Sequence, residues 1–160
     1  MKTLHFSTKI DASAEITWET MLDDATYRLW TRAFGSGYFE GSWLPGSEIM
    51  FLGDSDESEP IGGMVGVIAE HRPHEFVSIE YTGLIRYGDV DTESAYAQRL
   101  KGTHENYTFS EANGVTTLTV DLDVDEEEAE MFAEMWPKAL DNLRALAEGE
   151  AGTRGKHPAP

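Results

Sequence analysis

Residues 125–150, DEEEAEMFAEMWPKALDNLRALAEGE, carry the longest apolar pattern in the chain. Its apolar side chains recur at helical spacing: Phe132, Met135, Trp136, Ala139, Leu140, Leu143 and Leu146. This spacing predicts one amphipathic helix of about six turns. Asp125 is a natural N-cap, and Glu126 to Glu128 suit the positive end of the helix dipole. Pro137 lies inside the pattern and predicts a kink or a break near Trp136.

The chain before this helix is dominated by segments in which apolar and polar residues alternate, and a period of two predicts strands. The segments are residues 3–10, 37–43, 47–53, 64–72, 75–83, 103–111 and 114–124. Pro45-Gly46 and Asn113-Gly114 lie between successive segments and are hairpin signals. Together these features predict a seven-stranded antiparallel sheet.

Two short helices are expected directly after the first strand. Ser13 suits the N-cap of a helix over residues 14–24, and a second helix covers residues 25–30. Much later, residues 84–100 are the least regular part of the sequence and predict a long connection with room for a turn of helix.

The sheet has one apolar face to bury, and only the C-terminal helix, which spans about 35 Å, is long enough to cover it. We therefore expect an α+β fold in which the sheet curls around that helix. We expect a gap between the sheet and the helix at one end of the fold, closed by loops and the short helices. Residues 1–148 are expected to form a single domain, and residues 149–160 a disordered acidic and polar tail.

Four stretches of the sequence are similar to one known group of proteins. They are SAEITWETMLDDATYRLW (13–30), GGMVGVIAEHRPHEFVSIEY (62–81), ENYTFSEANGVTTLTV (105–120) and MWPKALDNLRAL (135–146). The chain resembles the START-like (SRPBCC, birch-pollen-allergen-like) superfamily, in the branch of the C-terminal domain of the heat-shock-protein-90 ATPase activator homologues. The resemblance implies the helix-grip fold. It implies no single activity, because superfamily members bind lipids, hormones or polyketides, catalyse cyclisation, or assist a chaperone.

Charge is the strongest compositional feature. The chain has 30 Asp and Glu against 12 Lys and Arg, a net charge of -18. The negative electrostatic potential of such a chain repels nucleic acid and anionic lipid, so neither is an expected partner. No apolar run reaches the length of a membrane-spanning helix, and no export signal or cysteine is present, which predicts a cytoplasmic location. The acid excess also predicts stability that rises with ionic strength.

Metal and nucleophile motifs are weak. His71 and His74 stand either side of a turn with no third histidine nearby, which favours surface histidines. Residues 121–130, DLDVDEEEAE, alternate acids like a calcium loop, but Glu126 occupies the position that requires glycine. Asp121 and Asp123 are better explained as the outward face of a strand. We expect no metal and no cofactor.

Several aromatic residues and methionines, with one glutamate, are predicted to line a cavity. The candidate ligand-binding residues are Trp30, Phe34, Tyr38, Tyr81, Glu105, Tyr107, Met131, Met135 and Trp136. Flexible methionines and amphipathic tyrosines suit an adaptable cavity, although each residue alone could simply be core.

Glu105 is the sharpest of these candidates. Tyr107 and Phe109 must face the helix, and a period of two then places Glu105 on the same inner face. A carboxyl group there must be paired or have a raised pKa. Either it reaches water or pairs with Arg99, Lys101 or a tyrosine hydroxyl, or it anchors a ligand. In the second case Glu105→Gln lowers the affinity for a hydroxylated ligand and leaves the melting temperature nearly unchanged.

Three functions remain open. The first is binding of a small, largely hydrophobic molecule between the sheet and the C-terminal helix. The second is an adaptor resembling the chaperone ATPase activators. The third is a cyclase-like or hydrolase-like enzyme that uses Glu105 as its acid or base, and one carboxyl group is thin support for it. A homodimer is compatible with all three.

Overall fold

The computed structural model describes residues 1–35, 37–53 and 62–154, and it has the expected α+β architecture. The strands are β1 (Lys2–Ile10), β2 (Gly37–Gly41), β3 (Glu48–Gly53), β4 (Gly63–Arg72), β5 (Phe76–Arg86), β6 (Asp89–Asp91), β7 (His104–Ala112) and β8 (Val115–Val124). Seven strands form an antiparallel sheet in the order β1-β8-β7-β5-β4-β3-β2, and the short β6 pairs with the end of β5. The predicted seven-stranded sheet is confirmed.

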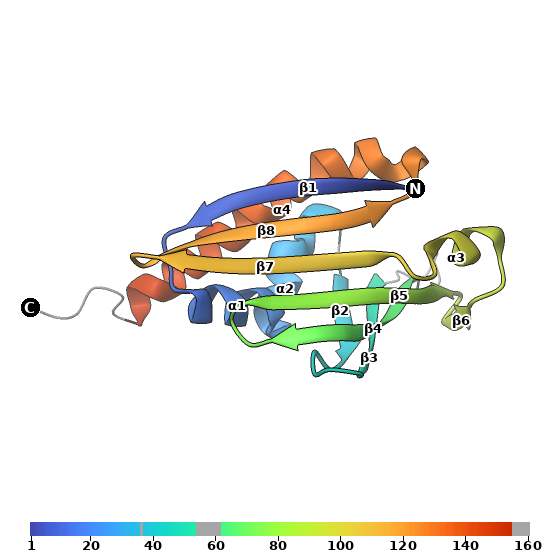
Figure 1. The fold of residues 1–160 in the computed structure, drawn as a ribbon, viewed down its shortest axis with the longest axis horizontal. Helices are drawn as coiled ribbons and strands as arrows, with labels where there is room; N and C mark the ends of the chain where they lie inside the picture. Colours follow the sequence, from blue (N-terminus) through green and yellow to red (C-terminus); the bar gives the residue numbers. More distant parts are fainter. Residues whose placement is uncertain (36, 54–61, 155–160) are drawn as a thin grey trace, which may run out of the picture.

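The helices are α1 (Ala14–Leu22), α2 (Asp24–Trp30), the short 3-10 helix η1 (Thr31–Phe34), α3 (Ala95–Leu100) and α4 (Glu126–Thr153). The helices other than α3 cover one face of this sheet, and α3 lies beyond the ends of β5 and β7 (Figure 1). Helix α4 runs across the sheet behind β1 and β8, and α1 and α2 lie beside it. The two short helices after the first strand and the long terminal helix are therefore present as predicted.

The predicted helix caps and the Asn-Gly hairpin turn are present in the structure. The Ser13 hydroxyl accepts a 3.1 Å hydrogen bond from the Ile16 N–H and caps α1, and the Asp125 carboxylate accepts one of 3.3 Å from Glu127 and caps α4. Asn113 and Gly114 both have positive φ, at 54° and 79°, which is the conformation of a tight hairpin turn.

The sheet curls where β4 meets β5. The register shifts between Val65 and Gly66, and again between Ile68 and Glu70. A Cβ atom on Gly66 would lie 2.6 Å from the Glu80 carbonyl oxygen, so only glycine allows the two strands to approach this closely. Bulges of this kind increase local twist, and they bend the sheet toward α4.

The core lies between the curled sheet and α4. Trp136, Ala139, Leu140 and Leu143 of the helix are buried, as are inward residues of β8 such as Leu118 and Val120. The alternation of β8 is complete, because Val120, Leu122 and Val124 are buried while Asp121 and Asp123 face the other side. The expectation that the acidic residues form the outward face of this strand is confirmed.

The end of α4 differs from the prediction. The chain was expected to lose order from residue 149, but the helix continues to Thr153. Ala151 is fully buried, and Arg154 forms an ion pair with Glu19 of α1 at 2.6 Å. Arg154 also pairs with Glu150 at 2.8 Å. A small buried side chain and two ion pairs, which are weak sequence signals, extend the helix. Residues 155–160 of the predicted tail lie outside the described residues.

Pro137 does not break α4. The residue lies on the exposed side of the helix, where its missing N–H leaves a carbonyl open to water. Its neighbours Trp136 and Ala139 are buried on either side of it along the chain, so core packing holds both halves of the helix in place.

Residues 84–100 contain more regular structure than a connection. Strand β5 extends to Arg86, and a turn at Tyr87 and Gly88, both at positive φ, leads into β6. The expected turn of helix is present as α3. None of the helices in the described ranges 1–35, 37–53 and 62–154 has both the length and the apolar character that crossing a membrane requires.

Candidate functional site

A cavity of about 330 Å³ opens between α4, the segment formed by α2 and η1, and strands β3, β4, β5 and β7. Most of its wall is aromatic or aliphatic. The larger side chains that line it are Tyr27, Trp30, Phe34, Tyr38, Phe51, Leu52, Met64, Tyr81, Tyr107, Phe132 and Trp136. Glu105 is the one acidic side chain among the described lining residues. The cavity is therefore an apolar space with a single carboxyl group in its wall.

Trp136 organises the wall from the helix side. Its ring lies 5.1 Å from the ring of Phe34, 5.8 Å from that of Trp30 and 6.2 Å from that of Tyr107, measured between centroids. These contacts join α4, α2, η1 and β7 around one side chain. The indole N–H of Trp30 donates a 3.0 Å hydrogen bond to the Met21 carbonyl, which fixes that ring as well.

Glu105 lies on the inner face of β7, as the period of two predicts, and only 7% of its surface is exposed. The Tyr81 hydroxyl donates a 2.8 Å hydrogen bond to Glu105 Oε1, and the Tyr107 hydroxyl donates one to Oε2. Tyr107 reaches it because residues two apart on a strand share a face. Tyr81 reaches it from the neighbouring strand β5. Among the partners considered from the sequence, the tyrosine hydroxyls are the ones the structure selects.

Burial dominates the electrostatics of this cluster. Loss of water raises the pKa of Glu105 above its ordinary value, and the hydrogen bonds from Tyr107 and Tyr81 oppose that increase. Burial and then the nearby Glu105 charge raise the pKa values of Tyr81 and Tyr107 well above the ordinary tyrosine value. The two hydroxyls therefore keep their protons and remain donors to Glu105.

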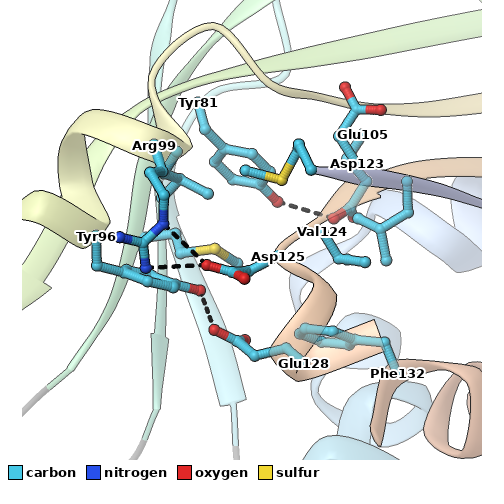
Figure 2. Close-up of a pocket in the computed structure, with 13 residues that line it drawn as sticks. Tyr81, Tyr96, Arg99, Glu105, Asp123, Val124, Asp125, Glu128 and Phe132 are labelled. Atoms are coloured by element: carbon cyan, nitrogen blue, oxygen red, sulfur yellow. Dashed lines mark hydrogen bonds and ion pairs between the residues drawn. The ribbon is translucent and has the colours of Figure 1, made fainter. Parts of the chain in front are cut away.

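A second, smaller cavity of about 40 Å³ lies on the other side of the same residues. Tyr81, Glu105, Met64 and Phe132 line both spaces. Figure 2 shows the smaller cavity, with Tyr81 directed toward Glu105 and with side chains of α3 directed toward the start of α4. Glu105 is thus reached from two sides.

Polar contacts close the outer wall of this smaller cavity (Figure 2). The Tyr96 hydroxyl of α3 donates a hydrogen bond to Glu128, and Arg99 forms a 3.0 Å ion pair with Asp125. Arg99 and the backbone N–H of Glu127 lower the pKa of Asp125, the backbone bond being the larger cause. Asp125 therefore caps α4 and ties α3 to it.

Seven of the nine predicted ligand-binding residues line the main cavity. They are Trp30, Phe34, Tyr38, Tyr81, Glu105, Tyr107 and Trp136. Met131 and Met135, the other two predicted residues, line neither cavity, and Met131 is 42% exposed. Met131 is exposed and Met135 is half-buried at the edge of the apolar stripe that contains Phe132 and Trp136. A one-residue offset along a helix turns a side chain by about 100°, which a count of apolar residues does not resolve.

Sequence reasoning missed several wall residues, above all Tyr27, Phe51, Met64 and Phe132. Phe132 carried a usable signal, since it belongs to the same helical stripe as Trp136. Tyr27 and Phe51 carried none, because helix α2 and strand β3 meet only in the folded chain, where their rings lie 6.1 Å apart.

The histidine and aspartate motifs have structural partners. His71 and His74 both pack edge-on against the Trp18 ring, and His71 Nδ1 lies 2.7 Å from the Trp43 carbonyl oxygen. Asp121 pairs with His5, and Asp123 accepts hydrogen bonds from Thr3 and the His104 N–H. Within the described parts of the chain, no three His, Asp or Glu side chains are grouped closely enough to hold a metal ion.

No protein-family model matches the chain, and comparison with curated proteins gives no match. Solved structures, in contrast, resemble it over almost its whole length. Protein NE0264 from Nitrosomonas europaea superposes with a TM-score of 0.73 at 13% identity, covering 94% of this chain and 96% of its own. The solution structure of the Aha1 dimer from Colwellia psychrerythraea gives 0.66 at 15% identity, covering 92% and 97%.

CalU16 from Micromonospora echinospora is a third structure of this kind, with a TM-score of 0.61 at 14% identity, covering 94% of this chain and 79% of its own. At identities this low, the likeness shows the fold alone. The chain shares the helix-grip fold of these structures, and the cavity is the feature of this fold that bears on its function.

Proposed function

We propose that the protein binds a small, largely apolar molecule in the 330 Å³ cavity, with Glu105 as the polar anchor. The observation that carries this proposal is a buried carboxyl group in the wall of an otherwise aromatic space. Burying a carboxyl group costs free energy, and an all-apolar wall would fold at lower cost. A cavity of this size, lined by hydrophobic side chains with one or two placed polar groups, is typical of small-molecule sites.

The wall also has the properties of a site that adapts to its ligand. Met64 and Phe132 are partly buried and separate the main cavity from the smaller one. A flexible methionine at that boundary can change rotamer and lengthen the available space toward α3. Neither side chain can form a strong hydrogen bond, so the cost of a rotamer change is limited to packing.

Filling the cavity tests the proposal directly. Met64→Trp places a large ring where both cavities meet, and Met131→Trp makes the same change at an exposed position that lines neither. Native mass spectrometry and thermal shift against a panel of sterols, fatty alcohols and polycyclic aromatics measure binding. We expect wild type and Met131→Trp to bind the same compounds and Met64→Trp to bind them at least about tenfold more weakly. Equal binding by all three proteins would place any ligand elsewhere.

A second candidate function rests on a different observation. Residues 135–146 resemble the heat-shock-protein-90 ATPase activator homologues, and the Aha1 structure shares the fold. We rank this adaptor role second because docking to a chaperone would not require a carboxyl group inside a cavity. Adding the purified protein to a chaperone of that class tests it, and an unchanged ATPase rate removes it.

A further inference from the structure

The polar end of the main cavity presents hydrogen-bond acceptors. Tyr81 and Tyr107 donate their hydroxyl protons to Glu105, so their oxygen atoms have only lone pairs left to offer. A carboxylate accepts about four hydrogen bonds, and these tyrosines use two of them. A ligand group that contacts Glu105, Tyr81 and Tyr107 must therefore bring its own hydrogen-bond donors.

Tyr27 adds a third hydroxyl to the same end. It lines the cavity, and its hydroxyl has no hydrogen-bond partner among the described residues. Burial raises its pKa, and the Glu105 charge raises it further. Tyr27 therefore stays protonated beside Glu105 and can accept from a ligand or donate to it.

Positive charge is missing from the wall. None of the described residues that line the main cavity is Lys, Arg or His. In the smaller cavity Arg99 is the one cationic side chain of the described lining, and it forms an ion pair with Asp125. The amino group of Met1, which also lines this smaller cavity, acts on Asp125 as well and helps to lower its pKa. A carboxylate or phosphate ligand would thus enter a buried space with an acid in its wall and no counter-charge, which is unfavourable for both groups.

The aromatic rings of the cavity wall can attract a cation in addition to Glu105. Trp30, Phe34 and Trp136 line the same cavity as Glu105. Tyr38 lines it as well, but the Arg28 guanidinium already lies over its ring, 5.0 Å from the centroid. The face of an aromatic ring carries partial negative charge and attracts an ammonium group, most strongly where water is excluded. The net charge of -18 acts in the same direction at long range, because it concentrates cations around the protein.

We propose that the ligand of this cavity is an organic amine, whose ammonium group pairs with Glu105 while its apolar body lies against the aromatic wall. This inference rests on the proposed function and narrows it to one class of ligand. An ammonium group brings up to three N–H donors to the acceptors of Glu105, Tyr81 and Tyr107, whereas an alcohol brings one and a carboxylate none.

Three probes with the same ring body separate the charge from the apolar contacts. They are 1-naphthylmethylamine, 1-naphthalenemethanol and 1-naphthoate, and isothermal titration calorimetry at neutral pH and low salt measures their affinities. We expect the amine to bind at least about tenfold more tightly than the alcohol, and the naphthoate more weakly than the alcohol. An alcohol that binds as tightly as the amine overturns the amine inference and leaves the proposed function standing. Failure of all three to bind counts against both.

Glu105→Gln assigns the charge preference to a residue. Its matched control is Glu134→Gln, which removes the same charge from an exposed position on α4. We expect Glu105→Gln to lose most of the preference for the amine over the alcohol, and the control to keep it. Unchanged amine affinity in Glu105→Gln contradicts the proposal. If that variant fails to fold, the three-probe series on the wild-type protein decides the question alone.

Discussion

The Tyr81 hydroxyl on β5 and the Glu105 carboxyl on β7 are joined by a 2.8 Å hydrogen bond beneath the cavity. With Tyr107 on the other carboxyl oxygen, this bond satisfies both oxygens of an acid that is almost completely buried. The acid is held in one orientation by two strands, so its remaining lone pairs are available at a fixed place in the wall. That arrangement is the basis of the first two predictions below.

Glu105→Gln is expected to change stability in a pH-dependent way. Burial raises the pKa of Glu105 from its ordinary value of 4.5, so the folded protein binds this proton more tightly than the unfolded chain. The free energy of unfolding therefore falls as pH rises from about 4.5 through the folded-state pKa. Gln does not titrate, so the variant gains stability relative to wild type across that window. Burial and the Glu105 charge raise the pKa values of Tyr27, Tyr81 and Tyr107, so these three hydroxyls stay protonated across the window.

Chemical denaturation at a series of pH values measures this difference, with Glu134→Gln as the control. Asp125 and Glu128, at the smaller cavity, are common to all three proteins and cancel in the comparison. The nearly unchanged melting temperature that the sequence predicts for Glu105→Gln is then expected near pH 4.5, at the acidic end of the range. A wild-type protein that gains stability over Glu105→Gln as pH rises would show that the carboxyl group has a lowered pKa.

Tyr81→Phe should raise the pKa of Glu105 further. The hydroxyl of Tyr81 stabilises the charged form of the carboxyl group, and its removal leaves burial less opposed. Carbon-detected NMR titration of the Glu105 carboxyl signal measures the shift. Tyr38→Phe is the control, because Tyr38 lines the same cavity without bonding to Glu105. An equal Glu105 pKa in both variants would mean that the hydrogen bond contributes nothing.

Ala151→Asp tests whether the last turn of α4 belongs to the domain. Ala151 is fully buried, so a carboxylate there loses water without gaining a partner, and we expect a loss of at least about 2 kcal/mol in the free energy of unfolding. Ala145→Asp makes the same change at an exposed position of the same helix. Urea denaturation compares the two. If both variants are as stable as wild type, residues 149–153 do not pack against the core.

Stability is expected to rise with ionic strength. The net charge of -18 makes the folded chain repel itself, and the screening length falls from about 30 Å at 0.01 M to about 10 Å at 0.1 M salt. The melting temperature should increase over this range of sodium chloride. A melting temperature that decreases would show that favourable ion pairs, such as Arg154 with Glu19, outweigh the repulsion.

The residues that β7 contributes to the site can be predicted from the sequence, because they follow from the alternation of a strand. The alternation of residues 103–111 places Glu105, Tyr107 and Phe109 on the inner face of β7, and all three are buried. Alternation works because a strand has two faces, so one correct assignment fixes every other residue. The caps Ser13 and Asp125 are equally local, because each bonds within its own first turn.

The sequence does not predict which residues from distant segments come together in the folded chain. The sequence alone determined the strand segments, the long helix and the inward position of Glu105, because each depends on spacing within a short segment. Only the tertiary structure decided that Tyr27 and Phe51 line the same cavity as Glu105, that Met131 and Met135 do not, and that Ala151 is buried. The physical reason is that these outcomes depend on the rotation of α4 and on how α2 meets β3. Those quantities are set by packing between segments far apart in the chain.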